Sequence, residues 1–263
     1  MLSFSLKKKE SKTSIYIYIY LDQKLAYHCS FTTSAEYSKV VTVSKNKMSL
    51  PFNFPSTIGV FGPSQVGKTT FVLKLIENAD SMFMTRPERI LYCYAVWQPS
   101  YEKLEKVPNV TLNEGVPTRA QVEEFTYDKN PTLLVLDDLM SQIIKDLDVQ
   151  HYVTVLGHHN NIGIVLLMQS IFPQGKCART ISLNCHYMVL FNNRRDLNQI
   201  KVLARQIMPG RSDFFMDSYK KAVSTPFSYL LIDIDPRSDP KFELRTRIFP
   251  QDEPLIIYEQ SAK

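Results

Sequence analysis

The sequence has little of what marks secreted, zinc-bound or membrane-spanning proteins. Only four of its 263 residues are cysteines, and none forms a CxxC or other paired spacing: Cys29, Cys93, Cys177 and Cys185. Zinc sites and disulfide frameworks use paired spacings, so the pattern argues against both and favours buried thiols in a reducing compartment. No apolar run approaches the roughly 20 residues needed to span a bilayer. We therefore expect an intracellular protein that is not secreted, with no membrane partner.

An excess of one charge is also missing from most of the chain. The net charge of +5 comes from 31 basic and 26 acidic residues, but eight lysines and three acids lie within residues 1–47, so 23 of each remain. Within this neutral remainder, residues 101–150 carry ten acids and five bases, whereas residues 176–221 carry nine bases and three acids. The basic segment is compatible with a polyanion-binding face and equally with a solvated helix surface.

The first 47 residues differ in composition from the rest of the chain. Residues 14–21, SIYIYIYL, alternate with the period of a β-strand, but a translated A/T dinucleotide repeat reads the same way. The segment has no arginine, which argues against a mitochondrial leader. We expect residues 1–47 to be a disordered or low-complexity extension, or a gene-model artefact, with Met48 as the functional start and residues 48–263 as one domain.

From Leu50 onward, short apolar runs alternate with helix-like segments. This alternation is typical of an α/β domain with a largely parallel central sheet flanked by helices. We expect strands at Thr57–Phe61, Arg89–Tyr94, Thr132–Asp137, Ile162–Met168, His186–Phe191 and Ser228–Ile234. We expect helices at Lys68–Asn78, Arg119–Phe125, Ser141–Leu156, Asp196–Met208 and Ser212–Ala222.

A glycine-bounded loop follows the first expected strand. Residues 62–69, GPSQVGKT, match the phosphate-binding pattern G-x-x-x-x-G-K-[ST] in full. In such a loop the backbone N–H groups surround a phosphate, the lysine adds a positive charge, the hydroxyl binds Mg²⁺ and the following helix points its positive end at the phosphates. We therefore predict a P-loop nucleotide site formed by Gly62, Pro63, Ser64, Gln65, Val66, Gly67, Lys68, Thr69 and Thr70.

Two further expected strands end in polar side chains. The run TLLVLDD ends in Asp137 and Asp138, and the run IGIVLLMQ ends in Gln169. Ligands of open α/β sheets bind at the carboxyl ends of the strands. We assign Asp137, with Thr69, to the Mg²⁺ shell and Asp138 to activating the attacking water. Gln169 would sense the γ-phosphate and orient that water, although a strand-end glutamine can also bond its own loop.

In this order, the glycine loop, the LLVLDD strand and the LLMQS strand resemble the FtsK/HerA superfamily of DNA-pumping ATPases. The likeness is closer to the genome-packaging ATPases of large eukaryotic DNA viruses and of Polinton (Maverick) virus-like transposons. It extends over residues 50–249 through segments such as GHHNNIGIVLLMQSIF, ISLNCHYMVLFNNRRD and LARQIMPG.

The resemblance implies a Mg²⁺-dependent ATPase that works as a homo-oligomeric ring and drives double-stranded DNA into a capsid, in the nucleus or a viral factory, with a capsid or portal protein as partner. Such a ring needs an arginine that reaches the neighbouring subunit's γ-phosphate. The candidates follow the sensor strand, and Arg179 is our first choice among Arg179, Arg194, Arg195 and Arg205.

Other readings stay open. A nucleotide-binding regulatory or domesticated protein would bind ATP without transport. A kinase or GTPase fits less well, because no guanine-reading N/T-K-x-D motif follows the loop. His158 and His159 precede the sensor strand and are read as ordinary surface or core residues. The aromatic cluster around Trp97 is read mainly as core packing, with base stacking as the alternative: Tyr92, Tyr94, Trp97 and Tyr101.

Overall fold

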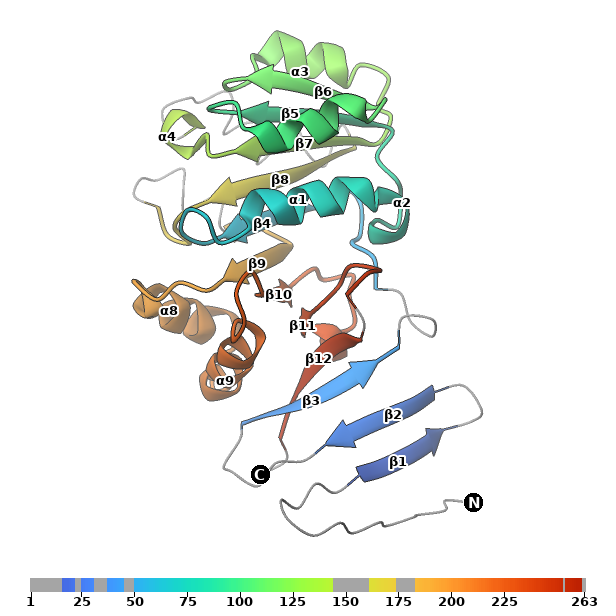
Figure 1. Ribbon diagram of the computed structural model, residues 1–263, viewed down its shortest axis with the longest axis vertical. Helices are drawn as coiled ribbons and strands as arrows, with labels where there is room; N and C mark the ends of the chain where they lie inside the picture. The colour runs from blue at the N-terminus through green and yellow to red at the C-terminus, as the bar shows by residue number, and fades with distance from the viewer. Residues whose placement is uncertain are drawn as a thin grey trace.

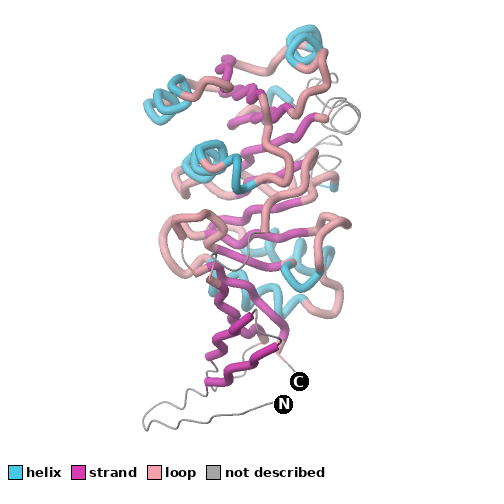
Figure 2. Tube along the Cα trace, turned by 90° about the vertical axis from the view of Figure 1, so that its right-hand side faces the viewer, coloured by secondary structure: helices cyan, strands magenta, loops and turns pink. Residues whose placement is uncertain are grey.

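A computed structural model describes residues 16–21, 25–30, 37–44, 50–143, 161–173, 183–252 and 254–261. In this part of the chain twelve strands form one elongated sheet (Figure 1) in the order β1-β2-β3-β12-β11-β10-β9-β4-β8-β7-β5-β6. Turned by 90°, the same molecule shows helices on either side of the strands (Figure 2). No helix among these residues is long and apolar enough to cross a membrane.

Six strands form a parallel unit that carries the phosphate loop. In spatial order they are β9 (Tyr187–Phe191), β4 (Thr57–Phe61), β8 (Ile162–Met168), β7 (Thr132–Asp137), β5 (Arg89–Tyr94) and β6 (Val110–Glu114). Every residue of β4, β7, β8 and β9 is buried, which explains their continuous apolar runs. Because these strands are parallel, their carboxyl ends meet at one edge of the sheet.

Helices cover both faces of the sheet and build two separate apolar cores. One core joins the strands to α1 (Lys68–Glu77), α2 (Ala79–Met82) and the 3₁₀ helix η1 (Pro99–Lys106). The other joins them to α3 (Arg119–Phe125), α4 (Met140–Ile143), α8 (Leu197–Ile207) and α9 (Ser212–Ala222). Successive residues of a strand alternate between the cores: Leu133 and Val135 pack on the first, Leu134 and Leu136 on the second.

The other six strands extend the sheet in antiparallel fashion. They are β10 (Tyr229–Asp233), β11 (Leu244–Thr246), β12 (Leu255–Gln260), β3 (Ser38–Val43), β2 (Leu25–Ser30) and β1 (Tyr16–Leu21). A short 3₁₀ helix, η3 (Pro240–Phe242), precedes β11.

Strand β3 is anchored to the helical layer as well as to β12. The Ser38 backbone N–H and hydroxyl both donate to Asp217 of α9 at 2.9 Å, and Lys221 donates to the Ser38 carbonyl at 2.8 Å. Val41 and Val43 are buried. The sequence analysis places residues 38–43 in the extension, whereas here they pack into the sheet, because their valines find an apolar partner surface in β12. The domain boundary at residue 48 stays a prediction.

The expected α/β architecture with a largely parallel central sheet is confirmed, and four expected strands match residue for residue: β4, β5, β7 and β8. Helices α3 and α9 also match the expected ranges. One end is a residue shorter than expected in β9 and α1, and both ends are a residue shorter in β10 and α8. The helix expected over residues 141–156 is observed as far as Ile143, and its remainder lies outside the described residues. Several elements were not foreseen from the sequence: β2, β3, β6, β11, β12, α2, η1 and η3.

Candidate nucleotide site

The glycine loop joins the end of β4 to the start of α1 at the carboxyl edge of the parallel strands (Figure 1). Gly67 caps α1 with φ 104°, a left-handed conformation that disfavours side chains. A Cβ at Gly62 would lie 2.8 Å from the Cβ of Phe191, closer than packed carbons approach. The loop therefore needs its two glycines for two different reasons, one conformational and one steric.

The Lys68 side chain folds back over the loop. Its Nζ donates to the carbonyl oxygens of Gly62 and Pro63, both at 2.8 Å. Burial lowers the pKa of Lys68, while the charges of Asp138 and Asp137 act in the opposite direction. Both hydrogen-bond acceptors are neutral carbonyls, so an anion at the loop would offer this ammonium a stronger partner.

Asp137 is a buried carboxylate at the end of β7 that accepts three hydroxyl hydrogen bonds on one oxygen. Its Oδ2 receives the hydroxyls of Tyr92 at 2.6 Å, Tyr101 at 2.9 Å and Thr69 at 3.2 Å. Burial raises the pKa of Asp137, and the three hydroxyl hydrogen bonds oppose that rise. Burial and the same carboxylate also raise the pKa values of Tyr92 and Tyr101, so both phenols remain protonated donors.

These residues fit a magnesium ion. The Thr69 hydroxyl and the Asp137 carboxylate are hard oxygen donors 3.2 Å apart, which is the donor type that Mg²⁺ prefers. The three hydroxyls are neutral, so they satisfy hydrogen bonds of Asp137 without cancelling its charge. A buried carboxylate in such surroundings gains from a nearby cation.

Asp138 and Gln169 meet across the ends of two adjacent strands. The Gln169 Nε2 donates to Asp138 Oδ1 at 3.2 Å, and both side chains are exposed. Asp138 has φ 56°, an uncommon conformation for a non-glycine residue that often marks functional positions. The two polar strand ends that the sequence analysis singled out therefore form one hydrogen-bonded pair.

A cavity of about 450 Å³ brings these groups together. Nine of its lining residues are ones that the sequence analysis assigned to the site: Ser64, Gln65, Gly67, Lys68, Thr69, Thr70, Asp137, Asp138 and Gln169. Gly62 and Pro63 do not line it but hold Lys68 through their carbonyls, and Val66 packs against the core instead. The roles assigned to these residues remain predictions.

Several residues at the site were not foreseen in these positions. Gln98, Ser100 and Phe227 also line the cavity. The rings of Tyr92 and Tyr101 pack together with centroids 5.2 Å apart, as expected of core aromatics, yet their hydroxyls serve Asp137. The available signal was tyrosine in the apolar run of β5, at Tyr92, since a buried phenol needs a hydrogen-bond partner.

Four arginines after the sensor strand were candidates for the arginine finger. Arg179 lies outside the described residues, as do His158 and His159. Arg194 and Arg195 are exposed just after β9, whose parallel neighbour β4 leads into the phosphate loop, and Arg205 is exposed on α8.

No protein-family model matches the chain, and no curated protein matches it. Among solved structures it is similar to B204, the DNA-packaging ATPase from Sulfolobus turreted icosahedral virus, with 12% identity, a TM-score of 0.49, and 81% of this chain and 100% of that one covered. It is also similar to the cytoplasmic domain of the Thermomonospora curvata type VII secretion ATPase EccC, with 9% identity, a TM-score of 0.49, and 88% and 29% covered.

A third similar structure is the KaiC-like protein PH0186 from Pyrococcus horikoshii OT3, with 11% identity, a TM-score of 0.42, and 78% and 90% covered. Likenesses this weak carry no argument about what this chain does.

Proposed function

We propose that the protein is a Mg²⁺-dependent ATPase. The observation that supports this most strongly is the convergence, around one cavity, of a complete glycine loop, a buried carboxylate beside the loop threonine and an exposed carboxylate–amide pair. Any one of these features occurs in proteins without hydrolytic activity. Together they supply a group for each task that phosphoryl transfer requires: phosphate binding, metal binding and water positioning.

Each residue has a distinct task in this proposal. The loop N–H groups and the start of α1 hold the phosphates, and Lys68 exchanges its two carbonyl partners for phosphate oxygens. Thr69 and Asp137 hold the Mg²⁺ ion, which when bound neutralises charge on the phosphates. Asp138 accepts the proton of the attacking water, and the amide of Gln169, already bonded to Asp138, orients that water.

We further propose that the protein moves double-stranded DNA as an oligomeric ring of the genome-packaging type. The support is the resemblance of its sequence segments to such ATPases, including those of virus-like transposons. In addition, four basic side chains in and just before α8 are exposed: Arg194, Arg195, Lys201 and Arg205. Lys201 and Arg205 lie one turn apart on α8, and exposed basic side chains suit contact with a phosphate backbone.

The test is the steady-state ATPase rate of the full chain with Mg²⁺, with and without double-stranded DNA. We expect hydrolysis that DNA stimulates and that falls at least about a hundredfold in Lys68→Ala. Lys106→Ala, at an exposed lysine on η1, is the matched control and should hydrolyse like the unmodified protein. Turnover that ignores DNA would contradict the translocase proposal, and tight ATP binding without turnover would favour a regulatory nucleotide-binding protein.

A further inference from the structure

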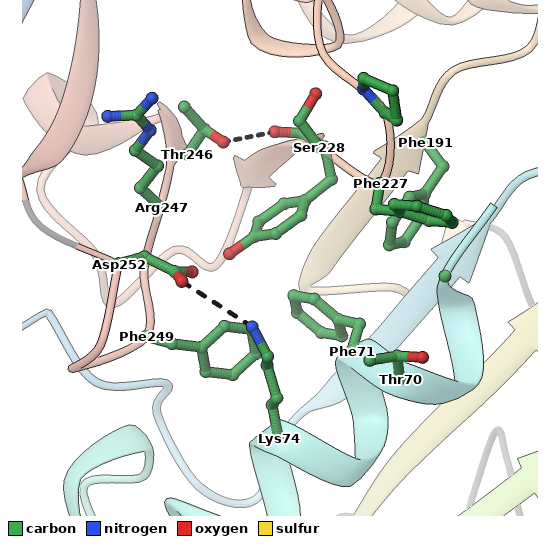
Figure 3. A pocket seen from close by; sticks show the side chains of 13 residues that line it. Thr70, Phe71, Lys74, Phe191, Phe227, Ser228, Thr246, Arg247, Phe249 and Asp252 are labelled. Carbon is green, nitrogen blue, oxygen red and sulfur yellow. Dashed lines mark hydrogen bonds and ion pairs between the residues drawn. The ribbon is translucent and has the colours of Figure 1, made fainter. Parts of the chain in front are cut away.

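A second cavity of about 450 Å³ lies beside the start of α1 (Figure 3) and shares part of its lining with the phosphate-loop cavity. Three residues line both cavities: Gly67, Thr70 and Phe227. A Cβ placed at Gly67 would lie 3.4 Å from the Phe227 ring, so this ring rests directly against the loop. A ligand with its phosphates on the loop could therefore extend past Phe227 into the second cavity.

The walls of the second cavity are largely aromatic. They include Phe71 from α1, Phe191 from the end of β9, Tyr229 from the start of β10 and Phe249 from the segment between β11 and β12. The volume lies within the ordinary range of small-ligand pockets, which are mostly apolar with a few polar groups. These walls suit a flat, aromatic ligand group.

Two lining residues are held in strained backbone conformations. Phe227 has φ 62° and a side chain that is 71% exposed, and Arg247 has φ 57° and is also exposed. A bulky residue with positive φ is a genuine outlier, and such strain gathers at ligand sites. Figure 3 shows the two side chains on opposite sides of the view, approaching from separate segments.

Most polar groups of the lining already have partners. The Thr246 hydroxyl donates to the Tyr229 carbonyl at 2.6 Å, and the Ser228 hydroxyl donates to the Thr225 carbonyl at 2.6 Å. Lys74 pairs with Asp252 at 3.8 Å and lies over the Phe249 ring. Strong discrimination between bases requires hydrogen-bonding groups directed at the base edge. With these groups engaged, the cavity is better suited to stacking on a base than to reading its edge.

We propose that the second cavity receives the purine base and ribose of the nucleoside triphosphate, with the base stacked on Phe227 and flanked by Arg247. The inference rests on the proposed function, because it assigns the phosphates of the same ligand to the loop. Stacking is tolerant of base identity, since every base presents a π-face. The protein should therefore bind ATP and GTP with affinities within about fivefold of each other, and bind both more tightly than inorganic tripolyphosphate, which occupies the loop alone.

The test compares ATP, GTP and tripolyphosphate, each with Mg²⁺, by isothermal titration calorimetry on the full chain. Phe227→Ala should weaken ATP and GTP binding about tenfold, and leave tripolyphosphate binding within twofold. Phe227→Tyr keeps a ring and should restore most of the affinity. The matched control is Tyr127→Ala, which removes another exposed aromatic ring just after α3. This variant should bind all three ligands normally. Thermal unfolding of each variant checks that it folds.

Two results would overturn the base site while leaving the proposed function in place. One is Phe227→Ala binding ATP as tightly as the unmodified protein. The other is an equal loss for ATP and tripolyphosphate, which would mean that Phe227 only supports the loop. ATP binding at least a hundredfold tighter than GTP binding would overturn the stacking mechanism. An unmodified protein that binds none of the three ligands would overturn the proposed function together with this inference.

Discussion

Tyr92→Phe should destabilise the protein through a single atom. The Tyr92 hydroxyl donates to the buried carboxylate of Asp137 at 2.6 Å, and a hydrogen bond to a charged group contributes about 1.5 to 3 kcal/mol net. The substitution removes the donor itself and leaves Asp137 with Tyr101 and Thr69, so no buried donor is orphaned. We therefore expect the lower end, about 1.5 kcal/mol, which for a domain of this size is about 3 to 6 °C in melting temperature.

The assay is thermal unfolding followed by circular dichroism at pH 8 and pH 5, without Mg²⁺. The Tyr92 hydroxyl favours the ionised carboxylate, and burial raises the pKa of Asp137 above its ordinary value. As pH falls, the carboxyl becomes protonated in both proteins, so the difference between them should shrink. Tyr94→Phe is the control, because its ring also packs on Tyr101 but its side chain is only half-buried. Equal melting temperatures at pH 8 would contradict this expectation, as would a difference that stays the same down to the lowest pH at which both proteins are still folded.

Three further substitutions test other parts of the structure. Gly67→Ala should lower the free energy of unfolding, measured in urea, by about 1 to 2 kcal/mol and should weaken tripolyphosphate binding. Gly210→Ala is the control, because Gly210 also has a positive φ but a Cβ there would meet no other atom. It should lose similar stability and bind tripolyphosphate normally. Asp137→Asn should melt above the unmodified protein at pH 8, because burial penalises the ionised form, and this advantage should vanish as pH falls through the raised pKa. The Arg245 guanidinium lies 2.9 Å from the buried Asp233 carboxylate. Arg245→Met leaves that carboxylate without its partner and should lower the free energy of unfolding, measured in urea, by about 3 to 5 kcal/mol. Adding Asp233→Asn removes the unpaired charge and should recover much of the loss.

The parallel unit was predictable because its strands are buried on both faces and read as continuous apolar runs. Strands β4, β7 and β8 are of this kind. The carboxyl edge was marked by Asp138 after β7, by Gln169 after β8 and by the glycine loop after β4. Strand β6 was missed because it lies at the sheet edge and none of its residues is buried. Strand β11 has only three residues, too few for any periodicity to show.

The site was predictable to the extent that it is local in sequence. The glycine loop is a contiguous motif, and Asp137, Asp138 and Gln169 end strands whose parallel order follows from the fold class. The hydroxyls of Tyr92 and Tyr101 converge on Asp137 only through tertiary packing across 36 to 45 residues. Phe227 reaches the loop from a turn before β10, about 160 residues away along the chain, and nothing in its neighbourhood in the sequence marks that contact.

The central proposal is that the loop, Asp137 and the Asp138–Gln169 pair form one hydrolytic site. The decisive measurement is single-turnover hydrolysis of ATP with Mg²⁺, compared between the unmodified protein and Asp138→Asn. We expect the unmodified protein to release the γ-phosphate. Asp138→Asn should bind ATP within about twofold of normal but release phosphate at least about a hundredfold more slowly, because the base is lost while the phosphate loop is intact. Equal release rates for the two proteins, or no release by the unmodified protein when ATP is fully bound, would contradict the proposal.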